Sequence, residues 1–225
     1  MKATLAGIFV AAALAAFGAT VPDRFDGKVR NDFFAGYAGN ADALARGMKS
    51  CEEILASNPK HAEALVWHGS GLYFQAGLAV RNGGEANGRR LFGAGLKEMD
   101  TAVAYQPDSV AVRVPRGATL LTGSRGIPDP ASARPLIEKG VGDYEAVLAR
   151  QESTFASLGE HLRGELLFGL AEGYSRLGNN EKAQVYFERI LAGLKGTEYA
   201  SRAEIWLKDK SLPQDRAGCV GCHVK

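Results

Sequence analysis

The stretch LFGLAEGYSRLGNNEKAQVYFERIL, Leu167–Leu191, decides the fold that we predict for this chain. A small residue lies in each half of it, Ala171 in the first and Ala183 in the second, with larger apolar residues three and four positions away. Steps of three and four place these residues on one stripe of an α-helix. A small residue within a stripe lets a neighbouring helix approach closely. The stretch therefore predicts two antiparallel helices in contact.

Similar stripes recur along the chain, and they come in pairs. Pro59 and Pro107 follow two of them by five residues and are expected to end those helices. Paired stripes of this kind predict helical hairpins stacked side by side. The stripes of the second helices are Gly47-Cys51-Ile54, Gly95-Met99-Ala102, Gly140-Tyr144-Val147 and Ala183-Phe187-Ile190, and those of the first helices are Leu65-Gly69-Leu72, Arg113-Gly117-Leu120 and Leu167-Ala171-Tyr174.

This spacing resembles the tetratricopeptide repeat, because the best copy has the family's Leu170, Tyr174, Gly178, Ala183, Phe187 and Leu191. The resemblance covers about residues 28–208. It implies an all-α solenoid of about four hairpins, within a repeat domain that we assign to residues 20–209. A final helix is expected to cap the open end of the core with Tyr199, Ala203, Trp206 and Leu207.

Two hairpins depart from the repeat spacing. The small residues of the first and fourth hairpins are 12 positions apart (35 to 47 and 171 to 183), but those of the second and third are 26 (69 to 95) and 23 (117 to 140) apart. The extra residues lie near Gly77–Leu91 and Thr122–Arg134 and are rich in Gly, Asn, Ser, Pro and Arg. We therefore predict loops on one rim of the stack. Such loops are either a binding surface or solvated segments without a partner.

The segment Cys219-Val220-Gly221-Cys222-His223 carries the chemistry. The spacing C-x-x-C-H is that of a c-type haem attachment site. We expect thioether bonds from Cys219 and Cys222 to one covalent haem c, with His223 as an axial ligand of the iron. A redox dithiol needs a strand-to-helix setting, and a zinc site needs four ligands. The polar tail around the motif does not suit a redox dithiol, and Cys51 is the only other cysteine that could complete a zinc site. Residues 210–225 are therefore predicted to be a haem-binding tail.

The N-terminal segment predicts export. Met1-Lys2 is followed by an apolar run over Leu5–Phe17, shorter than the roughly 20 residues of a membrane-spanning helix. Cleavage sites of the A-x-A type lie at Ala13-Leu14-Ala15 and Ala16-Phe17-Gly18. We therefore predict a signal peptide over residues 1–19 and a periplasmic or secreted protein, attached to a membrane only if the signal is not cleaved.

The sixth iron ligand is left open by the sequence. His161 begins the first helix of the best repeat copy and His61 lies in a turn between hairpins, so both are candidates. A five-coordinate iron and a ligand from another subunit are the alternatives. Met48, Met99 and Cys51 lie on helix stripes and are expected to fill the core. His68 is expected to be either a ligand or a hydrogen-bonded core histidine.

Charge and motifs restrict the function. The 27 basic and 25 acidic residues nearly balance, which does not favour nucleic acid or a membrane surface as a partner. No nucleophile motif, carboxylate pair or phosphate loop indicates an enzyme. We predict an electron carrier whose repeats dock a redox protein, another cytochrome or a neighbouring protomer, with a homo-oligomer formed through the haem arm. The alternatives are a haem-based gas or redox sensor with an open iron site and a protein-interaction scaffold.

Overall fold

The structure is a computed structural model that describes residues 24–211. These residues form nine α-helices and two short 3-10 helices, without a strand in that range. The predicted signal peptide, residues 1–19, lies outside the described residues, and so do Cys219, Cys222 and His223. The prediction of an all-α fold is confirmed.

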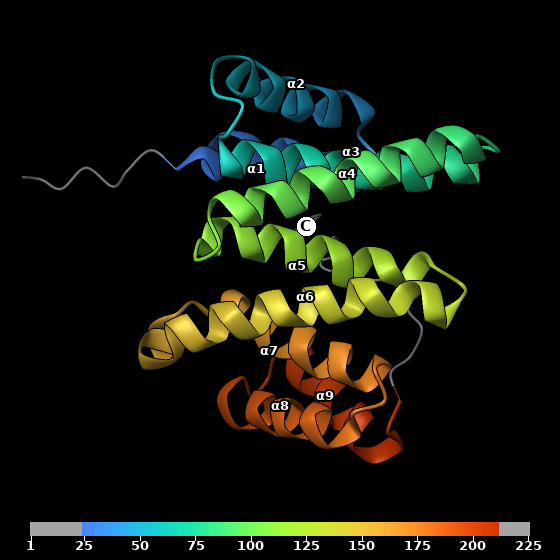
Figure 1. Ribbon diagram of the computed structural model, residues 1–225. Helices are drawn as coiled ribbons and strands as arrows, with labels where there is room; N and C mark the ends of the chain where they lie inside the picture. The colour runs from blue at the N-terminus through green and yellow to red at the C-terminus, as the bar shows by residue number, and fades with distance from the viewer. Residues whose placement is uncertain (1–23, 212–225) are drawn as a thin grey trace, which may run out of the picture.

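The helices form a stack of antiparallel hairpins, from α1/α2 at one end to α7/α8 and α9 at the other (Figure 1). Each first helix (α1, α3, α5 or α7) packs against its own second helix and against the next first helix in the chain. This is the arrangement of a helical hairpin solenoid. The helices are α1 (Phe25–Tyr37), α2 (Ala41–Ser57), α3 (Ala62–Arg81), α4 (Glu85–Tyr105), α5 (Val110–Gly123), α6 (Pro130–Gln151), α7 (Glu160–Arg176), α8 (Asn180–Gly193) and α9 (Glu198–Asp209).

The small residues of the stripes lie where paired helices touch. A Cβ atom on Gly95 of α4 would lie 2.6 Å from the carbonyl oxygen of Gly69 on α3, and one on Gly69 would lie 2.8 Å from that of Gly95. A contact as short as 2.6 Å excludes any side chain, so α3 and α4 pack backbone against backbone. Ala171 and Ala183 are both fully buried between α7 and α8. The contacts predicted from the stripes are therefore present.

Three of the hairpins share one turn design. Three residues join α1 to α2, α3 to α4 and α7 to α8, and the middle residue is Gly39, Gly83 or Gly178. These glycines have φ values of 111°, 80° and 80°, in the left-handed region where a side chain is strained. The N-cap side chains of Asn40 and Asn179 accept hydrogen bonds from backbone N–H groups of α2 and α8. The conformation of the turn is thus determined by residues within it, the central glycine and the capping asparagine.

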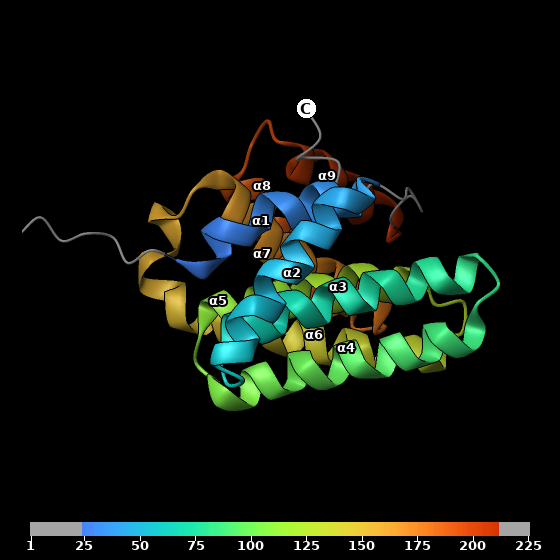
Figure 2. The same ribbon diagram turned by 90° about the horizontal axis from the view of Figure 1, so that it is seen from above.

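The loop predicted over Gly77–Leu91 is wrong. Both helices of this hairpin continue through it, α3 to Arg81 and α4 from Glu85, and their joined ends project past the neighbouring helices (Figure 2). The glycines that suggested a loop have other roles. Gly83 makes the turn, and a Cβ on Gly88 would lie 2.4 Å from a methyl carbon of Val80, so Gly88 allows the two helices to pack closely.

The loop predicted over Thr122–Arg134 is correct in part. After α5 ends at Gly123, a 3-10 turn covers Ser124–Gly126 and an extended link leads to Asp129. The helix α6 then begins at Pro130, five residues earlier than a loop to Arg134 would allow. Asp129 caps it by accepting hydrogen bonds from two backbone N–H groups, and proline suits the first helical position because its missing N–H would have no partner there.

The final helix caps the core as predicted. Ala203 and Trp206 of α9 are fully buried, and the indole ring of Trp206 stacks on Phe187 of α8 with ring centroids 4.6 Å apart. The indole N–H of Trp206 also donates to the hydroxyl of Ser175 on α7, at 2.8 Å. These contacts join α9 to both helices of the last hairpin and fix the direction in which the chain leaves the stack.

Candidate functional site

The structure describes the chain up to the start of the predicted haem-binding tail. The helix α9 ends at Asp209, and Lys210 has a left-handed backbone with φ 52°. The N–H of Lys210 donates to the carbonyl oxygen of Trp206 at 2.7 Å, and its ammonium group donates to the Gln184 side chain at 3.1 Å. The tail therefore starts beside α8, at the last turn of α9.

His161 lies in the first turn of α7 and faces α9. Its Nδ1 is 3.2 Å from the hydroxyl of Tyr199, and its Nε2 is 3.7 Å from a carboxylate oxygen of Glu165. The side chain is 42% exposed. Metal-binding histidines commonly donate from one ring nitrogen to an oxygen of the protein and bind the metal through the other. The Tyr199 hydroxyl can take the first of these roles, which makes Nε2 the nitrogen of His161 that would bind iron.

His61 has a structural role that conflicts with ligation. Its Nδ1 accepts a hydrogen bond from the backbone N–H of Ala64 at 3.1 Å, and it is the N-cap of α3. Its ring also packs on Phe25, with centroids 5.0 Å apart. A neutral imidazole that binds iron through Nε2 carries its proton on Nδ1 and cannot accept there. Ligation by His61 would therefore cost the cap, about 1 kcal/mol.

The length of the C-terminal segment also distinguishes His161 from His61 as candidate iron ligands. Cys219 follows Ser211 by eight residues (219 − 211), which span at most about 26–29 Å. Tyr199, beside His161, is eleven residues back along α9 from Lys210, or about 16 Å. The helix α3 lies three first-helix positions from α9, about 24–30 Å at 8–10 Å for each position, and His61 begins α3. The motif can therefore reach His161 with a relaxed tail, whereas His61 requires a more extended one.

The other sulfur and imidazole groups are part of the packed core. Met99 and Cys51 are fully buried and Met48 is 6% exposed, as the stripes predict. Burial, together with the nearby carboxylates of Glu98 and Glu52, raises the pKa of the Cys51 thiol to about 12. Such a thiol stays protonated and unreactive at neutral pH.

His68 joins three helices. Its Nδ1 is 2.6 Å from a carboxylate oxygen of Glu98 on α4, and its Nε2 is 3.5 Å from one of Glu52 on α2. Burial lowers the pKa of His68, but the hydrogen bonds and charges of the two carboxylates outweigh it and raise the pKa above its ordinary value of 6.5. The core-histidine alternative from the sequence therefore describes His68, and both of its nitrogens face acids.

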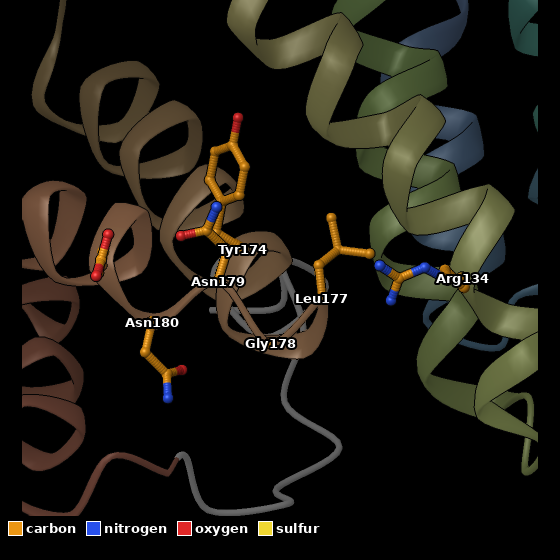
Figure 3. A pocket seen from close by; sticks show the side chains of 7 residues that line it. Arg134, Tyr174, Leu177, Gly178, Asn179 and Asn180 are labelled. Atoms are coloured by element: carbon orange, nitrogen blue, oxygen red, sulfur yellow. The ribbon is translucent and has the colours of Figure 1, made fainter.

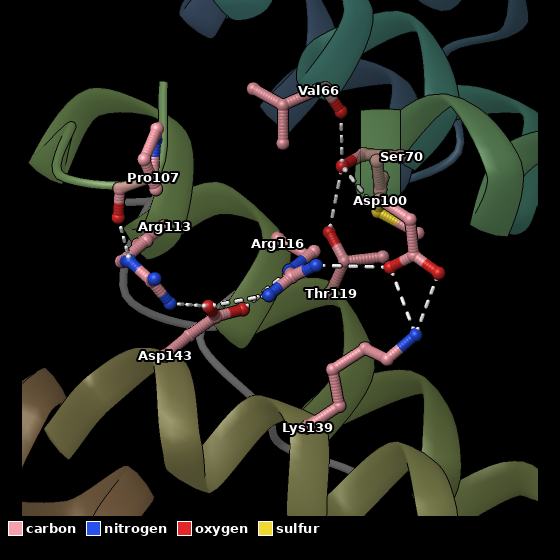
Figure 4. A network of polar contacts seen from close by, with 10 residues as sticks. Val66, Ser70, Asp100, Pro107, Arg113, Arg116, Thr119, Lys139 and Asp143 are labelled. Atoms are coloured by element: carbon pink, nitrogen blue, oxygen red, sulfur yellow. Dashed lines mark hydrogen bonds and ion pairs between the residues drawn. The ribbon is translucent and has the colours of Figure 1, made fainter. Parts of the chain in front are cut away.

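Arg116 makes the same kind of contact one hairpin later (Figure 4). Its guanidinium donates to Asp143 of α6 at 2.6 and 2.7 Å and to Asp100 of α4 at 2.9 Å. Arg113 donates to Asp143 at 2.7 Å, and Lys139 donates to Asp100 at 2.7 Å. We call each set a three-helix staple, the His68 staple (His68, Glu98, Glu52) and the Arg116 staple (Arg116, Asp143, Asp100).

The staples are absent from the sequence-based predictions, although the sequence contains a signal for them. Each cation precedes the small residue of its first helix by one position, Gly69 or Gly117. In each staple, one acid lies three positions after the small residue of a second helix, as Glu98 follows Gly95 in the His68 staple. The other acid lies five positions after such a residue, as Asp100 follows Gly95 in the Arg116 staple. Equal offsets in successive hairpins place the three groups at equivalent sites. In both staples the charged groups pair with one another, so we assign the staples a role in the stability of the fold.

A shallow pocket of about 580 Å³ lies at the turn between α7 and α8. The side chain of Leu177 points across it toward Arg134 of α6 (Figure 3). Its polar groups have structural partners. Asn179 caps α8, the Tyr174 hydroxyl bonds to Glu145 and Lys182, and Arg134 pairs with Glu138 at 3.0 Å. The pocket contains none of the predicted site residues.

Residues 24–211 do not bring together three or more His, Cys, Asp or Glu side chains that could hold a metal ion. Within the same range no helix has the length and apolar character that crossing a membrane requires. The chain matches no protein-family model, no curated protein and no solved structure. The features that point to a function are therefore the motif and the geometry around His161.

Proposed function

We propose that this chain is an exported c-type cytochrome with a single haem, which carries electrons and is built on a tetratricopeptide-like stack of hairpins. The observation that carries the proposal is the segment Cys219-Val220-Gly221-Cys222-His223, with two thiols and an imidazole at the spacing of haem attachment. The apolar N-terminal segment supports it, because a signal peptide would deliver the chain to the periplasm or outside the cell.

Among the described residues, His161 is compatible with the group that the motif implies. Cys219 and Cys222 would tether the haem, and His223 would bind one side of the iron. His161 offers Nε2 for the other side, since Nδ1 lies at hydrogen-bond distance from Tyr199. The bound iron would supply one-electron redox chemistry. His161 is favoured over His61, whose Nδ1 caps α3 and which lies on a helix further along the stack from α9.

The hairpin stack would serve as the docking scaffold. A rigid array of helices presents an extended surface to a partner, and we propose a redox protein or another cytochrome in that role. A neighbouring protomer is a further candidate, through the haem arm. Nothing in this function requires a catalytic residue, so we do not propose an enzyme.

The proposal can be tested on the full-length chain, exported from cells that contain c-type maturation machinery. A pyridine haemochrome spectrum and the intact mass are expected to show one covalent haem and the loss of the signal peptide. The double variant Cys219→Ser, Cys222→Ser is the control and should weigh no more than its polypeptide. A mature wild-type sample without haem would refute the proposal and leave a repeat scaffold. Carbon monoxide binding at a vacant iron position would instead indicate the sensor.

A further inference from the structure

The first halves of α7 and α9 form a face that matches the needs of a haem. It consists of His161 and Phe168 on α7 and of Tyr199 and Arg202 on α9, and we call it the α7/α9 face. The rings of Phe168 and Tyr199 lie 6.0 Å apart, and the Tyr199 hydroxyl is 3.2 Å from Nδ1 of His161. Phe168 is buried and Tyr199 is half-buried, so the face combines an imidazole with one partly exposed aromatic ring.

The close approach of Tyr199 to α7 depends on Gly164. A Cβ at this position would lie 2.2 Å from a carbon of the Tyr199 ring, so only glycine leaves room for the ring. Glu165 is also fixed, because one of its carboxylate oxygens accepts from the Tyr144 hydroxyl at 3.1 Å. The residues beside His161 therefore hold defined positions, and Tyr199 can fix the orientation of the imidazole.

Arg202 supplies positive charge at the same face. Its guanidinium carbon lies 4.5 Å from the centroid of the Phe168 ring, one turn of α9 beyond Tyr199. A haem has an apolar body and two propionate carboxylates, and guanidinium groups bind carboxylates well. A cation beside aromatic rings and a histidine is complementary to these features.

The C-terminal segment is long enough to return to this face. Lys210 has a left-handed backbone, the conformation that ends a helix and turns the chain away from its axis. A return along α9 to Tyr199 needs about 16 Å, and the eight residues from Ser211 to Cys219 supply up to about 26–29 Å. The haem motif of the same chain can therefore lie over the α7/α9 face without strain.

We propose that the α7/α9 face is the docking surface for this chain's own C-terminal segment, residues 212–225, with His161 binding the iron of the tail and Tyr199 positioning His161. This inference rests on the proposed function. Docking within one chain covers the apolar haem surface that a free arm would expose to water. Arg202 contributes by pairing with a propionate.

Absorption spectra of the haem-loaded full-length chain test the ligand. Wild type is expected to be six-coordinate and low-spin, and His161→Ala is expected to become five-coordinate or high-spin. His61→Ala is the matched control and should keep the wild-type spectrum while losing the α3 cap. If haem is attached but His161→Ala leaves the spectrum unchanged, the docking proposal fails and the proposed function stands. If no haem is attached, both fail.

Two further variants test the positioning roles. Tyr199→Phe should keep the fold and raise the affinity of the ferric protein for added cyanide by about 10-fold, because an unanchored imidazole is displaced more easily. Tyr186→Phe is its control, since Tyr186 stacks on Tyr174 away from this face. Arg202→Gln should shift the reduction potential, whereas Arg189→Gln, which removes the same kind of contact over Phe155, should not. Equal effects of variant and control would overturn these roles.

A mixing experiment with two variants distinguishes docking within one chain from docking on a neighbouring protomer. Haem-loaded His161→Ala is mixed with the haem-free Cys219→Ser, Cys222→Ser protein, which retains His161. Docking within one chain predicts that the high-spin spectrum persists at every concentration. Recovery of the low-spin spectrum on mixing would show that the ligand comes from another protomer and would overturn the proposal.

Discussion

The two long hairpins, α3/α4 and α5/α6, carry the same three-helix staple but with a different cation. In α3 the cation is His68, which lies between Glu98 and Glu52. In α5 it is Arg116, which lies between Asp143 and Asp100. Arginine stays charged at all accessible pH values, whereas histidine loses its charge near neutrality. One junction of the stack is therefore permanently charged and the other is titratable.

The two staples also differ in how deeply their acidic side chains are buried. The acids of the Arg116 staple, Asp143 and Asp100, are 0% and 45% exposed, while Glu98 and Glu52 are 27% and 61% exposed. The two cations are similarly buried, Arg116 at 10% and His68 at 13% exposure. A charge without water depends entirely on its partners, but an exposed one can return to solvent. The Arg116 staple should therefore contribute more to stability than the His68 staple.

Removal of Asp143 should have the largest effect. Asp143→Ala leaves Arg116 and Arg113 without their shared carboxylate, and breaking a buried pair in this way costs about 3–5 kcal/mol. Urea unfolding monitored by circular dichroism measures the loss. Asp108→Ala is the control, because it breaks an exposed pair with Arg150 and should cost less than about 1 kcal/mol. Equal losses for the two variants would show that the burial of Asp143 does not set the cost of removing it.

The helix contacts of the two hairpins should respond differently to an added methyl group. Gly95→Ala places a Cβ 2.6 and 2.9 Å from backbone atoms of Gly69 and Tyr73, which cannot move aside. We expect a loss of about 1–3 kcal/mol in the free energy of unfolding. Gly140→Ala meets a side-chain atom of Leu121 at 2.8 Å and should cost less.

The control for this pair is Gly93→Ala, in the same helix as Gly95. Nothing lies within 4 Å of a Cβ at Gly93, so the variant should gain about 0.5–1 kcal/mol from a lower backbone entropy cost. Thermal unfolding of the three variants gives their order. If Gly95→Ala were as stable as Gly93→Ala, α3 and α4 would not be in backbone contact.

Much of this fold could be predicted from spacing, because helix contacts repeat. The stripes through Gly95 and Ala183 located second helices, and Pro59 and Pro107 marked the ends of two of them. Composition misled the prediction for Gly77–Leu91, since its glycines serve a turn and a close helix contact. Such roles depend on the partner helix, which composition does not report.

The site was predictable only in part. The motif predicts the residues that would attach a haem, and these lie outside the described residues. His161 and His61 could not be separated by sequence, because the cap made by His61 and the contact of His161 with Tyr199 arise from folding. Tyr199 was expected to pack in the capping helix. Its contact with His161 follows only from the position of α9 beside α7.

The His68 staple predicts a pH dependence that the Arg116 staple lacks. The folded-state pKa of His68 is raised, so its contribution is fully present below its unfolded pKa, about 6.5, and is lost as pH rises through the folded value. Stability should therefore fall as the pH rises from about 6.5 through the raised folded-state pKa of His68. Urea midpoints across this range measure it.

The variant His68→Arg tests whether the difference between the two staples lies in the cation. It replaces the titratable group with the permanent one of the Arg116 staple, so the fall in stability above about pH 6.5 should disappear. His68→Gln should abolish the same pH dependence but with lower stability at acidic pH. A pH profile that is identical in wild type and both variants would assign the titration to another group.

The smallest effect is expected from shortening α3/α4. Its small residues are 26 positions apart against 12 in α7/α8, and the difference of 14 (26 − 12) is shared equally. Gly69 lies 12 residues before the end of α3, against 5 for Ala171 in α7, and Gly95 lies 10 after the start of α4, against 3 for Ala183 in α8. Each helix is thus seven residues longer, close to two turns of 3.6, and its buried stripe keeps its direction.

Removal of residues 75–81 and 85–91 should therefore leave a hairpin with the dimensions of α7/α8 and the same glycine turn. Most of the removed side chains are exposed, so the free energy of unfolding should change by about 1 kcal/mol or less. Deletion of five residues from each helix is the control, because it rotates each helix end by about 140° relative to its stripe. The shorter deletion should then do more damage than the longer one. If stability instead followed the number of residues removed, helical phase would not explain why a hairpin of this length fits the stack.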